Sequence, residues 1–332
     1  MSNWGVTDAY NQTIQYCFPN NNFSCTKNTK PGAEYIIVYI FISAVSMFTV
    51  FLNLLVIISI SHFKQLHTPT NALILSLAVA DLIVGLILTP VQGIKLIEPC
   101  WYFGEIFCSI FPLIFYVVIT ASLGNLIIIS VDRYIAVHDP LRYPTRVNNN
   151  RAVLSIVVNW LFSCIYSFII LYDSLFYLEG KHTCIGECQL FIKLGYIITD
   201  VFVTLVTPCC VIVSLYLKIC FVAKHQAKHL NSVTDKKARS EKKAARTLGV
   251  VVIVYLLCWI PYYIAALTLG QDSGDSLVIN IMYWIVCMNS CMNPLIYAMF
   301  YRWFRISAKY ILTLKIFEPS SEYFNLFPEE KL

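Results

Sequence analysis

Residues 109–131 read SIFPLIFYVVITASLGNLIIISV and are followed directly by Asp132-Arg133-Tyr134. The window contains no Asp, Glu, Lys or Arg, and it is long enough for a helix that crosses a hydrocarbon core of about 30 Å. Only two of the chain's 24 basic and 19 acidic residues, Asp81 and Asp200, lie in this window and six others like it. The sequence therefore predicts an all-α membrane protein with seven transmembrane helices. The other windows are 36–60, 72–94, 152–172, 194–217, 247–269 and 277–301.

The composition excludes a pair of soluble domains. Of the 332 residues, 58% are hydrophobic and 13% are charged, whereas a soluble chain has roughly a quarter charged residues. The segments on the N-terminal side of the spans carry 5 Lys and Arg, and those on the opposite side carry 19. Because basic loops stay in the cytoplasm, we expect an extracellular N-terminus. The net charge of +5 then reflects topology and does not indicate nucleic-acid binding.

This orientation gives a predicted domain plan. Residues 1–34 form an extracellular segment, 35–301 the membrane domain, and 302–332 an amphipathic helix and cytoplasmic tail. Two sequons in the first segment predict glycosylation at Asn11 and Asn22. Six of the 13 cysteines fall in the external segments, where disulfides persist. The tail after residue 302 has no cysteine, so a thioester-linked acyl anchor is excluded there.

Each span carries a short motif, and their order along the chain resembles the rhodopsin-like G-protein-coupled receptors. The resemblance implies a multi-pass receptor of the plasma membrane with no required cofactor. It covers nearly the whole chain, and its motifs are Asn53, Leu77-Ala-Val-Ala-Asp81, Asp132-Arg-Tyr134, Trp160, Pro208 with Tyr216, Cys258-Trp-Ile-Pro261 and Asn293-Pro-Leu-Ile-Tyr297.

Within that family the chain resembles the trace amine-associated receptors. The features are Gln15-Tyr-Cys17, Cys100-Trp-Tyr-Phe-Gly104 before Cys108, and the run DRYIAVHDPLRY from Asp132. The resemblance implies an amine odorant as ligand and a stimulatory G protein, acting through cyclic AMP, as partner. A serotonin-like biogenic-amine receptor is the alternative.

The resemblance also implies an ion site, a switch and disulfides. Asp81 with Ser122, Asn289 and Asn293 matches the family's sodium site; the alternative is a hydrogen-bonded Asp81 without an ion. Arg133 would pair with Asp132 and Glu241 at rest and with Tyr216 and Tyr297 afterwards, while Trp259 and kinks at Pro208, Pro261 and Pro294 transmit the change. Cys108 would bond Cys188, and Cys184 would bond Cys17 or Cys25. The resemblance gives Cys100 no partner.

Asp200 is the residue that suggests the ligand. It lies eight residues before Pro208, well inside the membrane, where an ionised Asp costs about 2.5–3.5 kcal/mol. Aminergic members of the family carry an Asp 18 residues before the Arg of the third span, but this chain has Phe115 there. We therefore expect the amine to bind Asp200 in the reverse orientation, and a relocated acid of this kind resembles a branch of fish olfactory trace amine-associated receptors. A single acid favours a monoamine.

Two alternatives to this interpretation remain. Asp200 could be capped by Thr199, Thr204 or a facing Tyr, or it could accept a hydrogen bond from a ligand that is not an amine. Aromatic faces stabilise ammonium groups, and we expect four or five of seven candidates to line the site. The candidates are Phe115, Tyr116, Trp259, Tyr262, Tyr263, Tyr283 and Trp284.

Two other classes are excluded by what the spans lack. A retinal-binding opsin needs a Lys in the seventh span, and Cys287 occupies that place. A membrane enzyme or transporter needs further intramembrane acids or histidines, and the spans contain two acids and no His. The chain is therefore not expected to be an enzyme.

Overall fold

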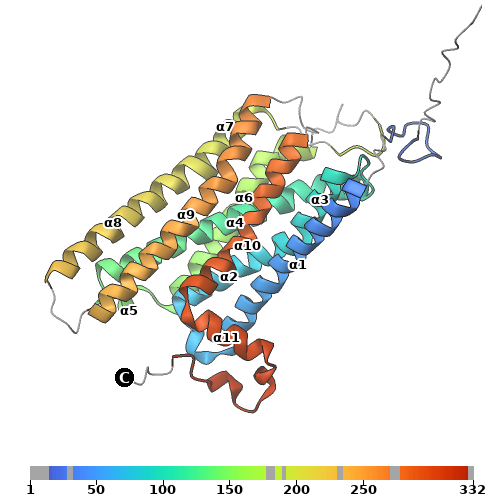
Figure 1. The fold of residues 1–332 in the computed structure, drawn as a ribbon. Helices are drawn as coiled ribbons and strands as arrows, with labels where there is room; N and C mark the ends of the chain where they lie inside the picture. Colours follow the sequence, from blue (N-terminus) through green and yellow to red (C-terminus); the bar gives the residue numbers. More distant parts are fainter. Residues whose placement is uncertain are drawn as a thin grey trace, which may run out of the picture.

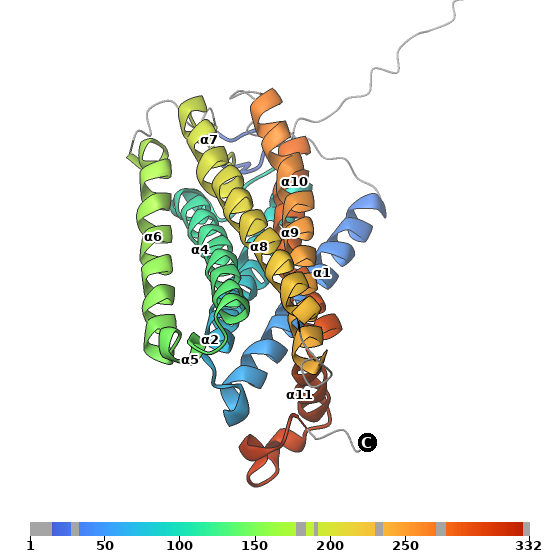
Figure 2. The same cartoon turned by 90° about the vertical axis from the view of Figure 1, so that its left-hand side faces the viewer.

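The computed structural model describes residues 15–27, 33–176, 184–188, 192–229, 235–269 and 277–327. Seven helical spans lie side by side in it (Figures 1 and 2). All seven are long and apolar enough to cross a membrane, which confirms the predicted fold class. In chain order they are α1 (Ala33–His62); α2 (Pro69–Ile83), η2 (Val84–Leu88) and α3 (Thr89–Ile97); α4 (Gly104–His138); α6 (Asn149–Phe176); α7 (Leu194–Asp200), η3 (Val201–Val206) and α8 (Thr207–His229); α9 (Asp235–Leu269); and α10 (Leu277–Phe300).

Short elements join the spans at one end of the bundle. There, η1 (Lys64–Leu66) follows α1, α5 (Tyr143–Arg146) follows α4, and α11 (Arg302–Leu312) follows α10. We call this end the inner end and the end that carries residues 15–27 the outer end, following the orientation predicted from the sequence. The amphipathic helix expected after residue 301 is α11, which buries Trp303 and Phe304 and exposes Arg302 and Arg305.

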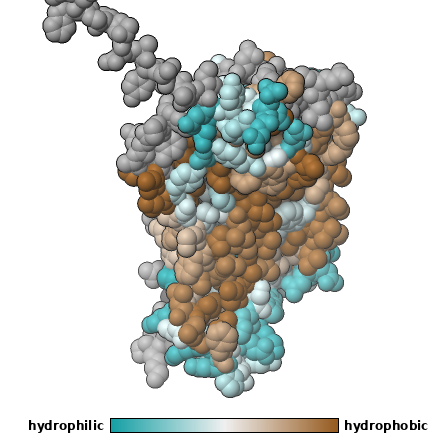
Figure 3. Space-filling model, turned by 90° about the vertical axis from the view of Figure 1, so that its right-hand side faces the viewer, coloured by the Kyte–Doolittle hydropathy of each residue, from teal (hydrophilic) through white to brown (hydrophobic). Residues whose placement is uncertain are grey.

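The third span is the centre of the bundle. Helix α4 contacts α2, α6 and α8 and buries much of its length, including Phe115, Ser122 and Asp132. The outward faces of the spans are apolar as well, as the brown surface in Figure 3 shows. Lipid tails solvate such faces, so packing and internal polar contacts hold the helices together.

Two spans carry a proline whose missing hydrogen bond is replaced by a neighbouring helix. Proline removes the donor that would bond the carbonyl four residues earlier. For Pro208 that carbonyl belongs to Thr204, and the hydroxyl of Tyr255 on α9 donates to it. For Pro294 it belongs to Ser290, and Asn53 Nδ2 on α1 donates to it at 3.2 Å. Each kink is therefore also a tie between two helices.

The second and fifth spans each contain a π-helical stretch, η2 and η3. Both stretches lie just before a proline, Pro90 in α3 and Pro208 in α8. A π-helical stretch shifts the helix face that follows it relative to the face before it. In the fifth span, Asp200 stands directly before η3 and is buried. The stretch thus sets which residues after Asp200 share its face.

Three disulfides fasten a cap over the outer end. Cys108 is bonded to Cys188, Cys25 to Cys184 and Cys17 to Cys100. The second bond selects Cys25 from the two alternatives for Cys184, and the third gives Cys100 a partner that the sequence did not assign. Main-chain bonds between Cys25 and Ile185 and between Trp101 and Gly186 add to the cap.

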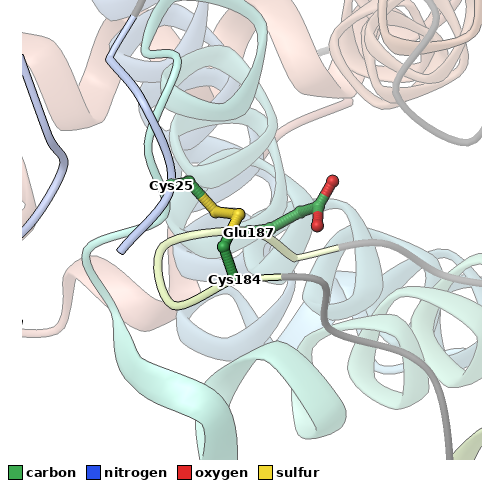
Figure 4. A group of neighbouring side chains, drawn as sticks. All are labelled: Cys25, Cys184 and Glu187. Atoms are coloured by element: carbon green, nitrogen blue, oxygen red, sulfur yellow. A yellow bond between two sulfur atoms is a disulfide. The ribbon is translucent and has the colours of Figure 1, made fainter. Parts of the chain in front are cut away.

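One group in the cap resembles a metal site only by composition. Cys25, Cys184 and Glu187 lie close together, but the two sulfurs are bonded to each other, and Glu187 extends away from them (Figure 4). A cysteine binds a metal as its thiolate, and both cysteines here are in a disulfide, so this group is structural. Asn22 is exposed in the cap, as an acceptor of a glycan would be, while Asn11 lies outside the described residues.

We predict that Gly186→Ala destabilises the protein by about 2–4 kcal/mol, because two costs add. The residue has a φ of +107°, and an added Cβ would lie 2.9 Å from Cys17 Cβ. Gly104→Ala is the matched control, because Gly104 has a φ of +80° but nothing within 4 Å of an added Cβ. In thermal unfolding of the purified protein, Gly186→Ala should have a lower melting temperature than Gly104→Ala. Equal stability of the two variants would contradict the packing argument.

Candidate ligand-binding site and switch

Asp200 is buried, with 4% of its surface exposed, and both of its carboxylate oxygens accept hydrogen bonds. Tyr166 Oη on α6 donates to Oδ1 at 2.7 Å, and Tyr263 Oη on α9 donates to Oδ2 at 2.8 Å. Thr204 donates to the main-chain oxygen of Asp200 at 2.8 Å and also contacts the Tyr263 hydroxyl. The acid is therefore turned into the bundle and held by neutral donors from two other spans.

Tyr166 was not predicted from the sequence. A signal for it exists in the polar residues Asn159, Ser163 and Ser167, which recur every four residues in α6 and are all buried. Residues at this spacing share one helix face, so they mark the side of α6 that faces the bundle. Tyr166 lies beside that stripe, and its hydroxyl reaches the fifth span.

The predicted aromatic residues form a contiguous cluster beside the acid. Tyr263 links the two, because its ring stacks on Trp259 at 5.7 Å and packs on Tyr262 at 5.0 Å. Tyr262 contacts Tyr283 at 4.8 Å, and Tyr283 contacts Phe115 at 5.1 Å. The face of the bundle next to Asp200 is thus built of rings from α4, α9 and α10.

Tyr116 belongs to this cluster, because its hydroxyl is hydrogen-bonded to those of Tyr262 and Tyr283, whereas Trp284 lies away from it. Tyr116 packs against Phe115 at 6.0 Å. Trp284 instead packs on Phe41 of α1 at 5.4 Å, so it faces the first span. Its neighbour Tyr283 occupies the inward face, because adjacent residues of a helix point about 100° apart.

Asp81 on the second span is hydrogen-bonded by side chains of two other spans, the third and the seventh. It is fully buried, its Oδ1 accepts from Ser122 Oγ at 3.3 Å, and its Oδ2 accepts from Asn293 Nδ2 at 2.8 Å. Asn289 is buried one turn earlier than Asn293 on α10. Carboxylate, hydroxyl and amide oxygens are the donors that a hard cation takes. The side chains present therefore fit a sodium ion.

At the inner end Arg133 is held by its own neighbour and by two residues that the sequence did not single out. Its Nε and Nη2 donate to Asp132 Oδ2 at 3.0 and 2.5 Å. Thr70 Oγ1 on α2 and Tyr143 Oη on α5 donate to the same carboxylate at 2.7 and 2.8 Å. Burial, together with the Asp132 charge, raises the pKa of Tyr143, so its hydroxyl remains a donor at neutral pH.

The other predicted switch residues lie apart from this group. The ring of Tyr216 packs against Gly249 of α9, and Tyr297, three residues after Pro294, packs on Tyr301 at 5.8 Å. The side chain of Glu241 lies outside the described residues. Trp259 is stacked between Tyr255 and Tyr263.

A solvent-open cavity of about 580 Å³ lies under the disulfide cap. It is bounded by the end of α3, the segment around Cys25, residues 184–188 and the start of α10. Glu98 and Glu187 are among its walls, and Gln92 and Asn280 bond each other at 3.1 Å, with Asn280 also in the wall. This cavity opens on the outer side of the bundle.

Comparison with known proteins identifies the family. The family model described as "7 transmembrane receptor (rhodopsin family)" matches residues 52–297. The chain is 40% identical to trace amine-associated receptor 13c of Danio rerio, over 94% of this chain and 96% of that protein. It is 39% identical to trace amine-associated receptor 6 of Homo sapiens (95% and 96%) and 40% identical to trace amine-associated receptor 9 of Mus musculus (96% and 96%).

We predict that Tyr143→Phe raises signalling in the absence of ligand by about twofold to fivefold, because Asp132 loses one hydrogen bond that holds the Arg133 group. Nucleotide exchange on a purified G protein, per folded receptor, measures this directly. Tyr134→Phe is the matched control, since Tyr134 packs its ring on His138. An unchanged basal rate in Tyr143→Phe would show that this hydroxyl does not restrain the switch.

Proposed function

Because the chain belongs to the rhodopsin family of seven-transmembrane receptors and, within it, to the trace amine-associated receptors, we propose that it detects a monoamine odorant through Asp200 and activates a stimulatory G protein. Membership makes it a G-protein-coupled amine receptor: a multi-pass protein of the plasma membrane, with a small-molecule ligand and a G protein as partners. It is not an enzyme and needs no cofactor.

The observation that carries the proposal is the environment of Asp200. Its carboxylate is buried at membrane depth, and within the part of the chain that the structure describes its side-chain hydrogen bonds come from neutral hydroxyls, those of Tyr166 and Tyr263. Neutral donors satisfy the lone pairs but leave the charge without an opposite charge. A ligand ammonium would compensate that charge through a charge-assisted hydrogen bond, which is about twice as strong as a neutral one.

The aromatic cluster supports a reversed orientation of the ligand. Phe115 stands where aminergic receptors have their acid, and it packs against Tyr283 of the seventh span, whereas Asp200 is hydrogen-bonded by the fourth and sixth spans. An ammonium held at the fifth span would therefore direct its apolar end toward the third and seventh spans. Ring faces next to a desolvated cation add about 0.5–2 kcal/mol each.

The same contacts connect the ligand to the switch. Tyr263 is hydrogen-bonded to Asp200 and stacks on Trp259, and Tyr255, about one turn before Trp259 in α9, donates a hydrogen bond to the Thr204 carbonyl in η3. A ligand that competes for Asp200 would loosen α9 from the fifth span. The sixth span could then move at its inner end and release Arg133 from Asp132, which makes α9 the bistable element. A sodium ion at Asp81 would favour the resting arrangement.

A second candidate rests on the same hydrogen bonds. With both oxygens already bonded, Asp200 can act as a structural acceptor that ties α6, α7 and α9 together. The receptor would then bind a neutral ligand through the aromatic cluster. An amine ligand should lose potency as rising pH deprotonates it, whereas a neutral ligand should not.

We predict that Asp200→Asn lowers amine potency by at least about a hundredfold, because a buried ion pair loses one partner. Cyclic AMP in cells given a panel of aliphatic and aromatic monoamines measures it. Asp173→Asn is the matched control: Asp173 is also an acid near the outer end, paired with Lys193 at 2.5 Å. If Asp200→Asn keeps full amine potency at normal surface expression, Asp200 is not the counter-ion of the amine, and the second candidate is favoured.

We further predict that N-methylation of the most potent amine weakens it. The hydroxyls of Tyr166 and Tyr263 already donate their hydrogen bonds to Asp200, so toward a ligand they can only accept. A primary ammonium, with three N–H donors, therefore suits the site better than its dimethyl derivative, which has one. Loss of charged hydrogen bonds costs about 1.5–3 kcal/mol each, so the dimethyl derivative should be about tenfold or more weaker. Tyr166→Phe should reduce the potency difference between the primary amine and its dimethyl derivative. If the potency ratio of the two ligands is the same in Tyr166→Phe and in wild type, Tyr166 does not accept a hydrogen bond from the ammonium.

A further inference from the structure

The segment after α11 reverses direction twice. Helix α11 ends at Leu312, and Leu314, with a φ of +59°, turns the chain into η6 (Lys315–Phe317). Ser320, with a φ of +62°, turns it again into η7 (Ser321–Tyr323). Two residues in the left-handed region are unusual in a short stretch without glycine. The reversals bring the chain back beneath α1 (Figure 1).

The returning segment is fastened to the loop between the first two spans. Lys64 Nζ forms an ion pair with Glu322 Oε1 at 2.8 Å, and Ser321 Oγ lies 3.0 Å from His62 Nε2. The main-chain nitrogen of Leu326 donates to Gln65 Oε1 at 3.0 Å, and the Leu326 side chain is fully buried. We call these contacts of residues 321–326 with His62–Leu66 the tail clasp.

The turn that the tail clasp holds in place exposes a set of large apolar side chains. Leu312, Leu314 and Phe317 are 57%, 68% and 83% exposed. Lys309 and Lys315 lie among them, are also exposed, and form no ion pair within the part of the chain that the structure describes. We call these five residues the tail tip. An apolar patch of this kind marks an interaction surface.

We propose that the tail tip inserts into the cytoplasmic leaflet of the membrane, with Lys309 and Lys315 on anionic lipid head groups. Mixed basic and large apolar side chains are the composition of segments that lie in the interface, and the cytoplasmic leaflet is the anionic one. The inference uses the inner orientation predicted from the Lys and Arg bias.

Two further observations select lipid as the partner. Helix α11 contacts α1 and α10, so the tail tip begins at the level where the spans leave the hydrocarbon. In Figure 3 the brown surface of the spans continues onto the lobe at the bottom of the molecule, where teal residues border it.

The test uses the full-length receptor in nanodiscs. Phe317→Trp places a fluorophore in the tail tip at a position that is already exposed, and wild type gives the background from the six native tryptophans. Brominated acyl chains should quench about half of the added emission in discs that contain phosphatidylserine, and less in discs of phosphatidylcholine alone. Lys309→Glu with Lys315→Glu should remove that difference between the two lipids.

Release of the tail clasp gives the second arm. Glu322→Lys places like charges opposite Lys64 and should detach the segment without touching the tail tip. Quenching by brominated lipid should then fall and quenching by aqueous iodide should rise. If iodide quenches the added emission in the otherwise wild-type background while brominated lipid does not, the tail tip faces water or a protein partner, and the proposal is overturned.

Discussion

In a hydrocarbon core no water is available, so the backbone polar groups and the ionisable side chains of a span need partners inside the protein. This constraint explains the contacts that hold the bundle together. The carbonyls left free by Pro208 and Pro294 receive donors from Tyr255 and Asn53 on other helices. Asp200 is satisfied in the same way, by phenols from α6 and α9. The positions that are costly in the membrane are thus the positions where helices are joined.

Near the candidate site, helix α9 makes two of these hydrogen bonds between helices. Helix α9 sends the hydroxyls of Tyr255 and Tyr263 to the fifth span, one to a carbonyl in η3 and one to Asp200. Both ties lie in the outer half of α9, while Arg133 at the inner end is held by α2, α4 and α5. The two ends of the bundle are therefore held by different sets of contacts. The acid that recognises the ligand is also a structural tie of the resting bundle.

Much of this architecture could be predicted, because the length and apolar composition of a segment decide whether it crosses the membrane. Apolar windows gave the spans, and motif order gave the family. The partners of Asp200 and Asp132 could not be predicted fully, since they depend on how each helix is rotated. Tyr166, Thr70 and Tyr143 became visible only when the helices were packed. Trp284 shows the same limit, because the sequence could not tell that it faces Phe41.

The disulfide cap has a consequence for how the chain is made. Cys17 and Cys25 emerge first, but their partners Cys100 and Cys184 follow 83 and 159 residues later. Cys184 comes after the fourth span, so Cys25 meets its partner only after more than half of the spans have been made, whereas Cys17 can meet Cys100 after the second span. During that interval the two early thiols are each other's nearest partners along the chain. A bond formed early between Cys17 and Cys25 would therefore have to be opened by thiol exchange before the two native disulfides could form.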